Sequence, residues 1–420
     1  MKPAKRQIFR AITLTATLAL AELLAALWLR LIRTDGHPQA LQIRQQQIAN
    51  GSAASDAASE TIHPWLGWVH NPQLASPEPI DGRLAGTNAL GFRDNQHPVT
   101  HKSPDQLVVA ITGGSVAWRF SWEAESTLAQ LLSQHPKLAG RTLRIVRLAL
   151  PGYKQPQQLF ALNYILALGG EFDAVVNIDG FNDSVLSILE NAQQGTAIDF
   201  PRSWHARSIL ITDPRYSSEA AQLLNLRGNR QARAQSILQS PLRHSSLRQL
   251  LWLVQDDLDH HKLLELAQTI TRSRTDSFVH HGPPPPSDPD IANQNAIDLW
   301  ARCSIQMFDL CHARRIAYIH CLQPSQYLPN SKPFSQFEQD LCLTPDQPHA
   351  VLAQTLFPLL QKRGQQLGSH GVPFADLTDI FKNHPETLYS DPWCHVNADG
   401  NKLLAQAIAP LLVQALENQP

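Results

Sequence analysis

Short apolar runs recur along the chain, and longer amphipathic stretches separate them. The apolar runs occupy residues 106–112, 143–150, 172–179 and 315–322, with a weaker run at 372–377. Most of them are almost continuously apolar, which is typical of strands buried on both faces of a parallel sheet. The amphipathic stretches fall at residues 126–134, 156–168, 294–314, 350–367 and 401–416. This alternation of strand and helix predicts an α/β domain built around a parallel sheet of five strands.

The alternation stops between residues 185 and 290, where there are helical patterns but no good strand pattern. In one of these patterns, the apolar residues from Leu247 to Leu264 approximate a single helical face. The interval ends in GPPPPSDPD, a polyproline-like connector. We expect a helical insertion that packs on or over the α/β domain, which covers residues 62–420.

The N-terminal region differs in character from the rest of the chain. Residues 11–29, AITLTATLALAELLAALWL, form an apolar run with a single charged residue, Glu22. As a helix this stretch would span roughly 28 Å at about 1.5 Å per residue, close to the hydrocarbon thickness of about 30 Å. Residues 1–33 are therefore predicted to be a membrane anchor, with a cleaved signal segment as the alternative. Glu22 is costly in lipid unless it is protonated or paired with a partner helix.

Basic residues flank this apolar stretch, with more before it than after it. The flanking residues are Lys2, Lys5, Arg6 and Arg10 on one side, and Arg30 and Arg33 on the other. This modest asymmetry favours a cytoplasmic N-terminus and a single crossing. Residues 34–61, rich in Gln, Ala, Ser and Asp, then predict a polar stalk or a solvated helix, and the large domain is expected outside the cytoplasm.

Composition narrows the possible partners. The 420 residues are 43% apolar and carry a formal net charge of -1, so a large core is expected and nothing favours a nucleic-acid partner. The five cysteines form no CxxC pair, which argues against a zinc ribbon or a thioredoxin-type site. Pairing of Cys342 with Cys394 in an oxidising compartment stays open. The doublets at 260–261 and 280–281 are His-His, but without a supporting carboxylate or cysteine pattern we favour solvated surface over a metal site.

The residues able to do chemistry follow the predicted strands. Gly113-Gly114-Ser115 comes directly after the first strand, and Gly152 follows the second. Ligands of parallel α/β sheets bind outside the carboxyl ends of the strands, so Ser115 is a candidate nucleophile. The alternative is a structural turn in which Ser115 caps a helix. The backbone N–H of Gly152 can serve as an oxyanion donor.

Two later segments add to this set. The third strand leads to Asn182, whose amide can donate to an oxyanion or can form an Asx turn that caps the next helix. We expect its neighbour Asp183 to anchor the loop by hydrogen bonds. Near the C-terminus, Asp391 and His395 share one short loop. A carboxylate beside an imidazole can hold the ring in the tautomer that accepts a serine proton.

Together these residues resemble the SGNH (GDSL-type) hydrolase family. Ser115, Gly152, Asn182 and His395 follow the order of the four blocks of that family, and GFND at 180–183 is similar to its G-x-N-D block. NALGFRDN and CLQPSQY, at 88–95 and 321–327, look like a membrane-anchored bacterial branch. The resemblance runs from about residue 62 to the end of the sequence, without the insertion.

The resemblance implies a flavodoxin-like three-layer α/β/α sandwich with a five-stranded parallel sheet. In the family pattern Ser115 is the nucleophile and His395 the base, with Asp391 as its helper. The N–H groups of Ser115 and Gly152 and the amide of Asn182 form the oxyanion hole. No metal or cofactor is implied.

The implied function is a serine esterase that removes ester-linked acyl groups. O-acetyl groups of an envelope or exported glycan are the expected substrate. An O-acyltransferase with the same residues is one alternative, and a non-catalytic envelope scaffold or carbohydrate-binding protein is another. The implied location is the bacterial inner membrane, with a single crossing and the large domain in the periplasm.

Two features depart from the family pattern. Gly113-Gly114-Ser115 stands where the family name implies Gly-Asp-Ser, and three residues rather than two separate Asp391 from His395. The longer spacing leaves open a Ser–His dyad in which a backbone carbonyl orients the ring. The glycine–serine segment is also close to the G-x-S-x-G motif of α/β-hydrolases, but that motif normally follows several strands, whereas Ser115 follows the first.

Overall fold

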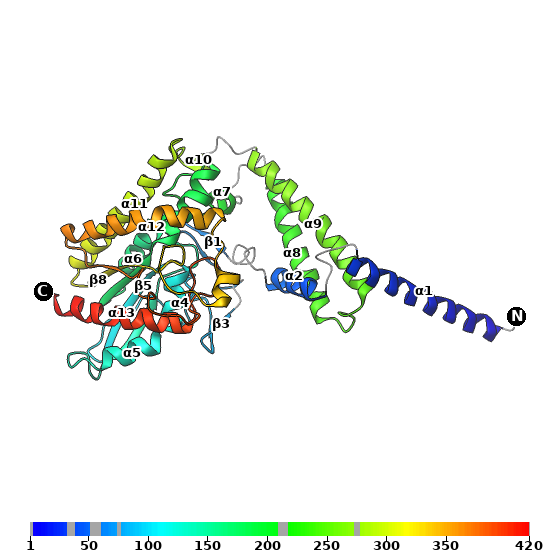
Figure 1. Ribbon diagram of the computed structural model, residues 1–420, viewed down its shortest axis with the longest axis horizontal. Coiled ribbons are helices and arrows are strands. Elements are labelled where there is room, and N and C mark those ends of the chain that lie inside the picture. Colours follow the sequence, from blue (N-terminus) through cyan, green and yellow to red (C-terminus); the bar gives the residue numbers. More distant parts are fainter. Residues whose placement is uncertain are drawn as a thin grey trace. The chain divides into compact units, whose positions relative to one another are not determined.

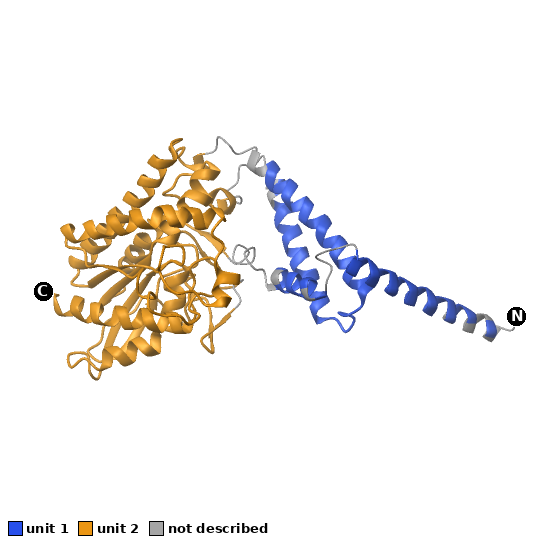
Figure 2. Cartoon of the chain, viewed as in Figure 1, with its two compact units in different colours: residues 1–58, 209–276 blue, residues 59–208, 277–420 orange. Residues whose placement is uncertain are grey.

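A computed structural model describes residues 3–31, 38–50, 60–73, 77–208, 217–272 and 278–419 of the chain. Contacts between residues divide the chain into two compact units (Figure 2). Residues 1–58 and 209–276 form one, which we call the helical unit, and residues 59–208 and 277–420 form the other, which we call the sheet unit. All the predicted site residues belong to the sheet unit.

The sheet unit contains the five parallel strands that the hydrophobic pattern predicts (Figure 1). They are β5 (Gln106–Gly113), β6 (Thr142–Arg147), β7 (Ala174–Asp179), β8 (Ala317–Leu322) and β9 (Phe374–Asp376). Their order in the sheet is β6-β5-β7-β8-β9, and each neighbouring pair is parallel. Strand β6 is shorter than predicted, because residues 148–150 already belong to the loop at the sheet edge. Strand β8 starts later than predicted, after Arg315 takes a left-handed conformation with φ 55°.

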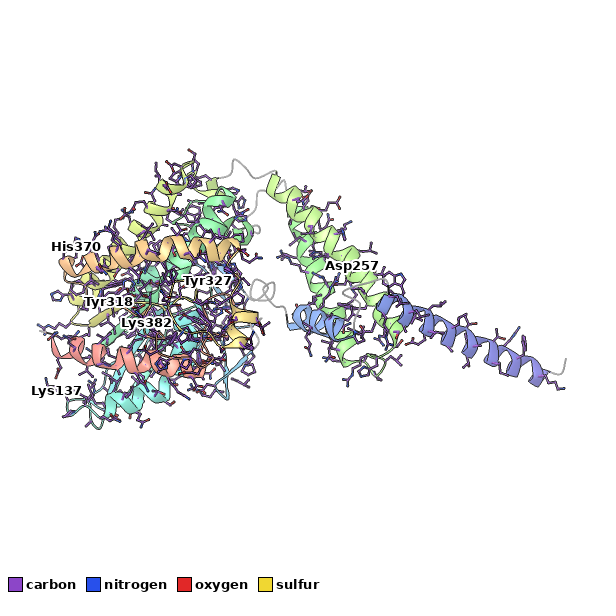
Figure 3. All side chains as sticks on the ribbon, in the orientation of Figure 1. Lys137, Asp257, Tyr318, Tyr327, His370 and Lys382 are labelled. Carbon is purple, nitrogen blue, oxygen red and sulfur yellow. The ribbon has the colours of Figure 1, made fainter. Side chains whose placement is uncertain are left out.

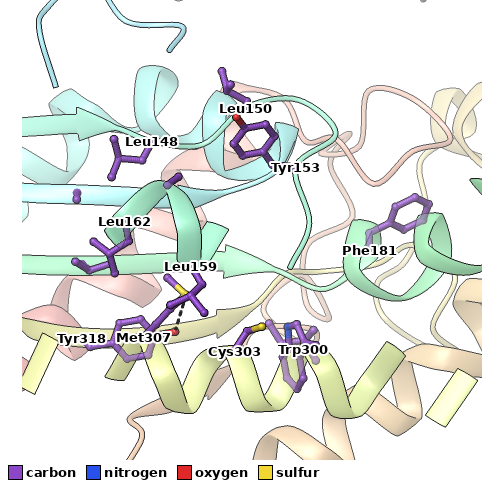
Figure 4. Close-up of a cluster of buried hydrophobic side chains, with 14 of the residues drawn as sticks. Leu148, Leu150, Tyr153, Leu159, Leu162, Phe181, Trp300, Cys303, Met307 and Tyr318 are labelled. Atoms are coloured by element: carbon purple, nitrogen blue, oxygen red, sulfur yellow. Dashed lines mark hydrogen bonds between the residues drawn. The ribbon is translucent and has the colours of Figure 1, made fainter. Parts of the chain in front are cut away.

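Helices bury both faces of the sheet. Along β5 the side chains alternate: Val109 and Ile111 enter one apolar cluster, and Val108 and Ala110 enter the other. The Val108 cluster includes residues of α6 (Gln157–Ala167), α11 (Pro289–His312) and α12 (Pro348–Leu367), and part of it is drawn in Figure 4. The Val109 cluster includes residues of α4 (Ser115–Glu123), α5 (Glu125–Ser133) and α13 (Ala398–Glu417). Burial on both faces explains why the strand sequences are nearly continuous apolar runs.

The hydrophobic pattern predicted neither helix α4 nor two small hairpins, although a helix capped by Ser115 was one alternative for this segment. The sequence pattern begins a helix only at residue 126, whereas α4 begins at Ser115. Its N-cap is Gly114, which offers no side-chain hydrogen bond, so the usual start signal is missing. The hairpins pair β1 (Glu60–His63) with β2 (Gly67–His70) and β3 (Glu78–Ile80) with β4 (Arg83–Ala85). Strands this short carry too few residues for a period to be read.

The helical unit contains α1 (Pro3–Leu31), α2 (Pro38–Asn50), α8 (Ser217–Gln239) and α9 (Ser246–Arg272). Helices α8 and α9 come from the middle of the predicted insertion, and they pack against each other and against α2 and α1, respectively. Helix α2 lies within the predicted polar stalk. It is not fully solvated, because its Leu41 is buried in a cluster with Trp252 and Leu253 of α9.

Helix α1 contains the predicted anchor. Within the described residues, Ile12–Leu31 is long and apolar enough to cross a membrane. The carboxylate of Glu22 accepts hydrogen bonds from the Ser245 hydroxyl (2.9 Å) and the Leu247 N–H (3.1 Å), and also from the N–H of Ser246. It therefore caps the first turn of α9, where a helix presents unsatisfied N–H groups and a positive dipole end. The one acidic residue of the apolar stretch thus has a partner helix.

Candidate active site

Ser115 stands at the junction of β5 and α4. An added Cβ at Gly113, which has φ 140°, would lie 2.1 Å from the carbonyl oxygen of Ile178, so only glycine fits the last position of β5. Ser115 is the first residue of α4 and does not cap it, because the N-cap is Gly114. The Ser115 N–H therefore belongs to the first turn of the helix, where backbone donors are unsatisfied and the dipole favours negative charge.

His395 links Ser115 to Asp391. Its Nδ1 lies 2.6 Å from Asp391 Oδ2, and its Nε2 lies 2.6 Å from Ser115 Oγ. An ionised carboxylate can only accept, so the proton of the neutral ring belongs on Nδ1, and Nε2 accepts from the serine hydroxyl. This arrangement allows a histidine to take a serine proton. The three side chains are partly exposed, so a ligand can reach them.

The longer spacing between Asp391 and His395 does not separate them. Cys394 takes a left-handed conformation with φ 64°, which turns the chain back within the loop. The Trp393 N–H donates to Asp391 Oδ1 at 2.8 Å, and a β-bridge between Tyr389 and Val396 closes the loop. Burial of Asp391 opposes its ionisation, but the hydrogen bond and charge of His395 outweigh it, and the pKa of the carboxyl lies below its ordinary value. Asp391 is therefore ionised at neutral pH.

Asn182 lies against the segment that carries Ser115. Its Nδ2 donates to the carbonyl of Tyr153 at 2.9 Å, which uses one of the two amide hydrogens and fixes the plane of the amide. The same Nδ2 would lie 2.2 Å from a Cβ added at Gly114. The loop after β6, with Gly152 at φ 89°, thus meets the loop after β7 beside the start of α4. The structure brings these predicted residues to one edge of the sheet.

Asp183 anchors this edge, as the sequence suggested. Its carboxylate accepts from the N–H of Gln155 at 2.6 Å and from the N–H of Gly180 at 3.1 Å. The carboxylate thereby ties the loop after β6 to the loop after β7. Burial, together with the nearby Asp179, raises the pKa of Asp183 above its ordinary value.

The CLQPSQY segment supports the loop of Asp391. Gln326 Nε2 donates to the Asp391 carbonyl at 2.9 Å, and the Tyr327 hydroxyl donates to the Pro392 carbonyl at 2.7 Å. Tyr327 is itself buried, and Figure 3 marks its position in the sheet unit. The sequence resemblance singled out this segment but assigned it no role. Its contacts show that it holds the backbone of the loop that carries Asp391 and His395.

The NALGFRDN segment supports helix α4. The Arg93 carbonyl accepts from the indole N–H of Trp118 at 3.2 Å. Asp94 forms a buried ion pair with Arg147 at 3.3 Å, and the Arg147 guanidinium stacks on the ring of Trp122. This segment therefore fixes the helix that begins at Ser115.

A second serine–histidine–aspartate constellation lies inside the sheet unit. His320 Nε2 is 2.8 Å from Asp179 Oδ1, and its Nδ1 is 2.7 Å from Ser304 Oγ. All three residues are fully or almost fully buried. The Asp179 carboxylate also accepts from the indole N–H of Trp300 at 2.7 Å and from Asn177 at 2.8 Å. No substrate reaches this serine, so the constellation holds the core together.

The structure answers the open question of a disulfide and corrects one interpretation of the histidine doublets. All five cysteines lie in the described part of the chain, and each is a buried, free thiol, so Cys342 and Cys394 are not paired. His280 is buried and bonded to Ser208 at 2.7 Å, so solvated surface was wrong for the second doublet, although His260 and His261 are exposed. Among the described residues, no group of three or more His, Cys, Asp or Glu side chains is arranged to hold a metal ion.

No protein-family model matches the chain, and no curated protein matches it. The function of the site is therefore inferred from its own geometry and chemistry.

Gly114→Ala tests the close approach of Asn182. The added methyl must displace the Asn182 amide, because 2.2 Å is too short for any Cβ contact. We expect a loss of about 1–3 kcal/mol in the free energy of unfolding, the usual cost of overpacking. Chemical denaturation measures the loss, and a crystal structure shows the shift of Asn182. Gly368→Ala is the control, because nothing lies within 4 Å of a Cβ added there. An unshifted Asn182 at wild-type stability would contradict this packing.

Glu338→Gln tests the support beneath the Asp391 loop. The Glu338 carboxylate is buried and accepts from Lys332 Nζ at 2.5 Å and from the N–H groups of Leu388 and Tyr389, each at 2.9 Å. Burial raises its pKa, but these donors outweigh burial, and the pKa lies below its ordinary value. A depressed folded-state pKa gives stability above the unfolded value, and that stability is lost as pH falls through the folded value.

We therefore expect Glu338→Gln to lower the free energy of unfolding by about 3 kcal/mol at neutral pH, since it leaves Lys332 buried without a charged partner. The difference from wild type should shrink in acid. Urea unfolding at neutral and acidic pH measures both. Glu386→Gln is the control, because the Glu386 side chain is 52% exposed. A loss that does not change with pH would show that the charge of Glu338 is not what stabilises the loop.

Proposed function

We propose that the chain is a serine esterase of the SGNH type. The observation that carries the proposal is the continuous hydrogen-bonded series from Asp391 through His395 to Ser115, with both distances at 2.6 Å. Support also comes from Asn182 and the Gly152 loop, which lie at the same sheet edge as the serine. The helices on both faces of the parallel sheet are compatible with a flavodoxin-like three-layer α/β/α sandwich.

In the proposed reaction Ser115 Oγ forms a bond to the ester carbonyl carbon while its proton passes to His395 Nε2. The carbonyl oxygen takes the negative charge of the tetrahedral intermediate. Collapse of the intermediate breaks the bond to the alcohol oxygen, which leaves with the proton from His395. Water then attacks the carbonyl carbon of the acyl-serine, with His395 taking its proton. Collapse of this second intermediate breaks the bond to Ser115 Oγ, which regains its proton from His395 as the free acid leaves. Asp391 stabilises the imidazolium formed in each half of the reaction.

The proposed oxyanion hole combines three donors. The N–H of Ser115 lies in the first turn of α4, where the helix dipole favours negative charge. The N–H of Gly152 and the second amide hydrogen of Asn182 would complete the set. One donor of this kind is worth about 10²–10³ in rate, because it acts where charge develops in the transition state.

The proposed substrate is an O-acetylated glycan of the envelope or an exported glycan. Trp393, between Asp391 and His395, is 40% exposed and stacks on His349 with ring centroids 4.3 Å apart. A held, exposed indole on the loop that carries Asp391 and His395 offers an apolar face on which a sugar ring can pack. If a sugar hydroxyl replaces water in the second step, the same acyl-enzyme makes the protein an O-acyltransferase. A non-catalytic envelope scaffold has less support, because the serine, histidine and asparagine are all intact and hydrogen bonded.

The apolar helix α1 supports a location at a membrane. We propose a single crossing of the bacterial inner membrane with the sheet unit in the periplasm, where exported glycans are found. The motivating observations are the apolar length of Ile12–Leu31 and the larger number of basic residues before it.

Acetate release from O-acetylated glycans and from aryl acetates tests the proposal. Ser115→Ala should lower kcat/KM by at least about 10³-fold, since the nucleophile is lost. Asp391→Asn should lower it by about 10²–10⁴-fold, because an amide can stabilise the wrong tautomer of His395.

Ser304→Ala is the matched control, because Ser304 also bonds a histidine but is buried. It should retain wild-type turnover once its folding is verified. Parallel assays with and without a deacetylated glycan as acceptor separate hydrolysis from transfer. If neither acetate release nor acetyl transfer occurs with any of these esters, the esterase proposal is wrong.

A further inference from the structure

One cationic side chain lies beside the proposed oxyanion hole and has no role in the proposed reaction. Arg202 places its Cδ and Nη1 each 3.0 Å from the position that a Cβ at Gly152 would take. Any side chain at position 152 would strike this guanidinium. The glycine at position 152 thus makes room for a positive charge beside the loop.

Arg202 is held in place by the segment that precedes it. Asn191 Nδ2 donates to the carbonyls of Ala197 and Phe200, each at 2.9 Å, and the Ser203 N–H donates to Asn191 Oδ1 at 3.1 Å. Ser203 itself is in a left-handed conformation with φ 50°. The hydrogen bonds of the Asn191 side chain therefore fix the backbone on both sides of Arg202. A fixed backbone restricts where the Arg202 guanidinium can lie.

Only part of the hydrogen-bonding capacity of the Arg202 guanidinium is used within the described part of the protein. Its Nε donates to Glu190 Oε2 at 2.6 Å, and no acceptor is found for its Nη groups among the described residues. The Arg202 side chain is 34% exposed, so solvent reaches part of it. Arg207 nearby is different, because both Nε and Nη2 of Arg207 are bound by Glu60, at 2.7 and 2.9 Å. Arg207 is thus a structural ion pair, whereas Arg202 keeps donors for a ligand.

We propose that Arg202 binds a carboxylate of the substrate, so that the esterase acts on an acidic glycan. The inference rests on the proposed function and narrows its substrate class. Two Nη donors of a guanidinium match the two oxygens of a carboxylate. The charge of Glu190 offsets part of the charge of Arg202, which favours a singly charged carboxylate over a doubly charged phosphate.

Matched aryl acetates test the proposal in the full-length protein. The probes are phenyl acetate, its 3- and 4-carboxy derivatives, and 4-acetoxyphenyl phosphate. The quantity measured is the ratio of kcat/KM for the charged ester to that for phenyl acetate. We expect a wild-type preference for a carboxylated ester. Arg202→Gln should lower that preference by about 10- to 100-fold, the usual value of a charge-assisted hydrogen-bonded pair, and Arg202→Lys should lower it less.

Two further variants separate recognition from structure. Glu190→Gln keeps an acceptor for Nε and removes a negative charge, so the preference for the carboxylated ester should rise. Arg363→Gln is the matched control, because Arg363 is also partly exposed and pairs with one carboxylate, that of Asp298, at 3.1 Å. It should leave the preference unchanged. An Arg202→Gln preference equal to that of wild type would overturn the proposal, and so would a wild-type preference for the phosphate ester over both carboxylated esters.

Binding measured in a variant that cannot cleave the ester keeps this test separate from the esterase proposal. Calorimetric titration of 4-carboxyphenyl acetate into Ser115→Ala and into Ser115→Ala/Arg202→Gln needs no catalysis. We expect the affinity to fall by about 10-fold or more when Arg202 is also replaced. Lack of turnover by wild type together with Arg202-dependent binding would remove the esterase proposal and leave the carboxylate site. Equal affinity of the two variants would remove the site.

Discussion

The hydrogen bond between Asp391 and His395 is the interaction on which the rest of the site depends. It sets the ring tautomer, and the tautomer decides whether Nε2 can accept the proton of Ser115. The loop that carries both residues is too short to fix this geometry alone. Gln326 and Tyr327 hold its backbone carbonyls, and buried Glu338 holds the segment before it. These contacts together bring the Asp391 carboxylate to Nδ1 of His395.

Burial distinguishes the two serines that are hydrogen bonded to a histidine. Ser115 and Ser304 have the same kinds of partner at similar distances, yet only Ser115 lies at the exposed carboxyl edge of the sheet. Two glycines precede Ser115 because neither position has room for a side chain: Gly113 packs against the Ile178 carbonyl, and Gly114 packs against the Asn182 amide. The Gly-Gly-Ser sequence follows from this packing. In this chain a larger residue before the serine would displace the amide that we propose as an oxyanion donor.

Much of this arrangement could be predicted from the sequence, because parallel strands place their carboxyl ends at one edge. Ser115 and Asn182 each follow a buried apolar run, so their meeting needs only the sheet. The contact of Asp391 with His395 was harder to foresee, since it depends on the left-handed conformation of Cys394. Arg202 could not be predicted, because Asn191 positions it through bonds to a segment without a sequence pattern. Likewise, nothing in the sequence of α1 indicated that Glu22 caps α9.

The most direct measurement of the central claim is the site of covalent modification by a fluorophosphonate. Such a reagent reacts with a serine whose proton is removed by a neighbouring base and whose oxyanion is stabilised. Peptide mass spectrometry of the folded, full-length protein should find a single phosphonyl group on Ser115, and none when Asp391 is replaced by asparagine under the same exposure. An unmodified protein, or modification at Ser304 or another serine, would contradict the account.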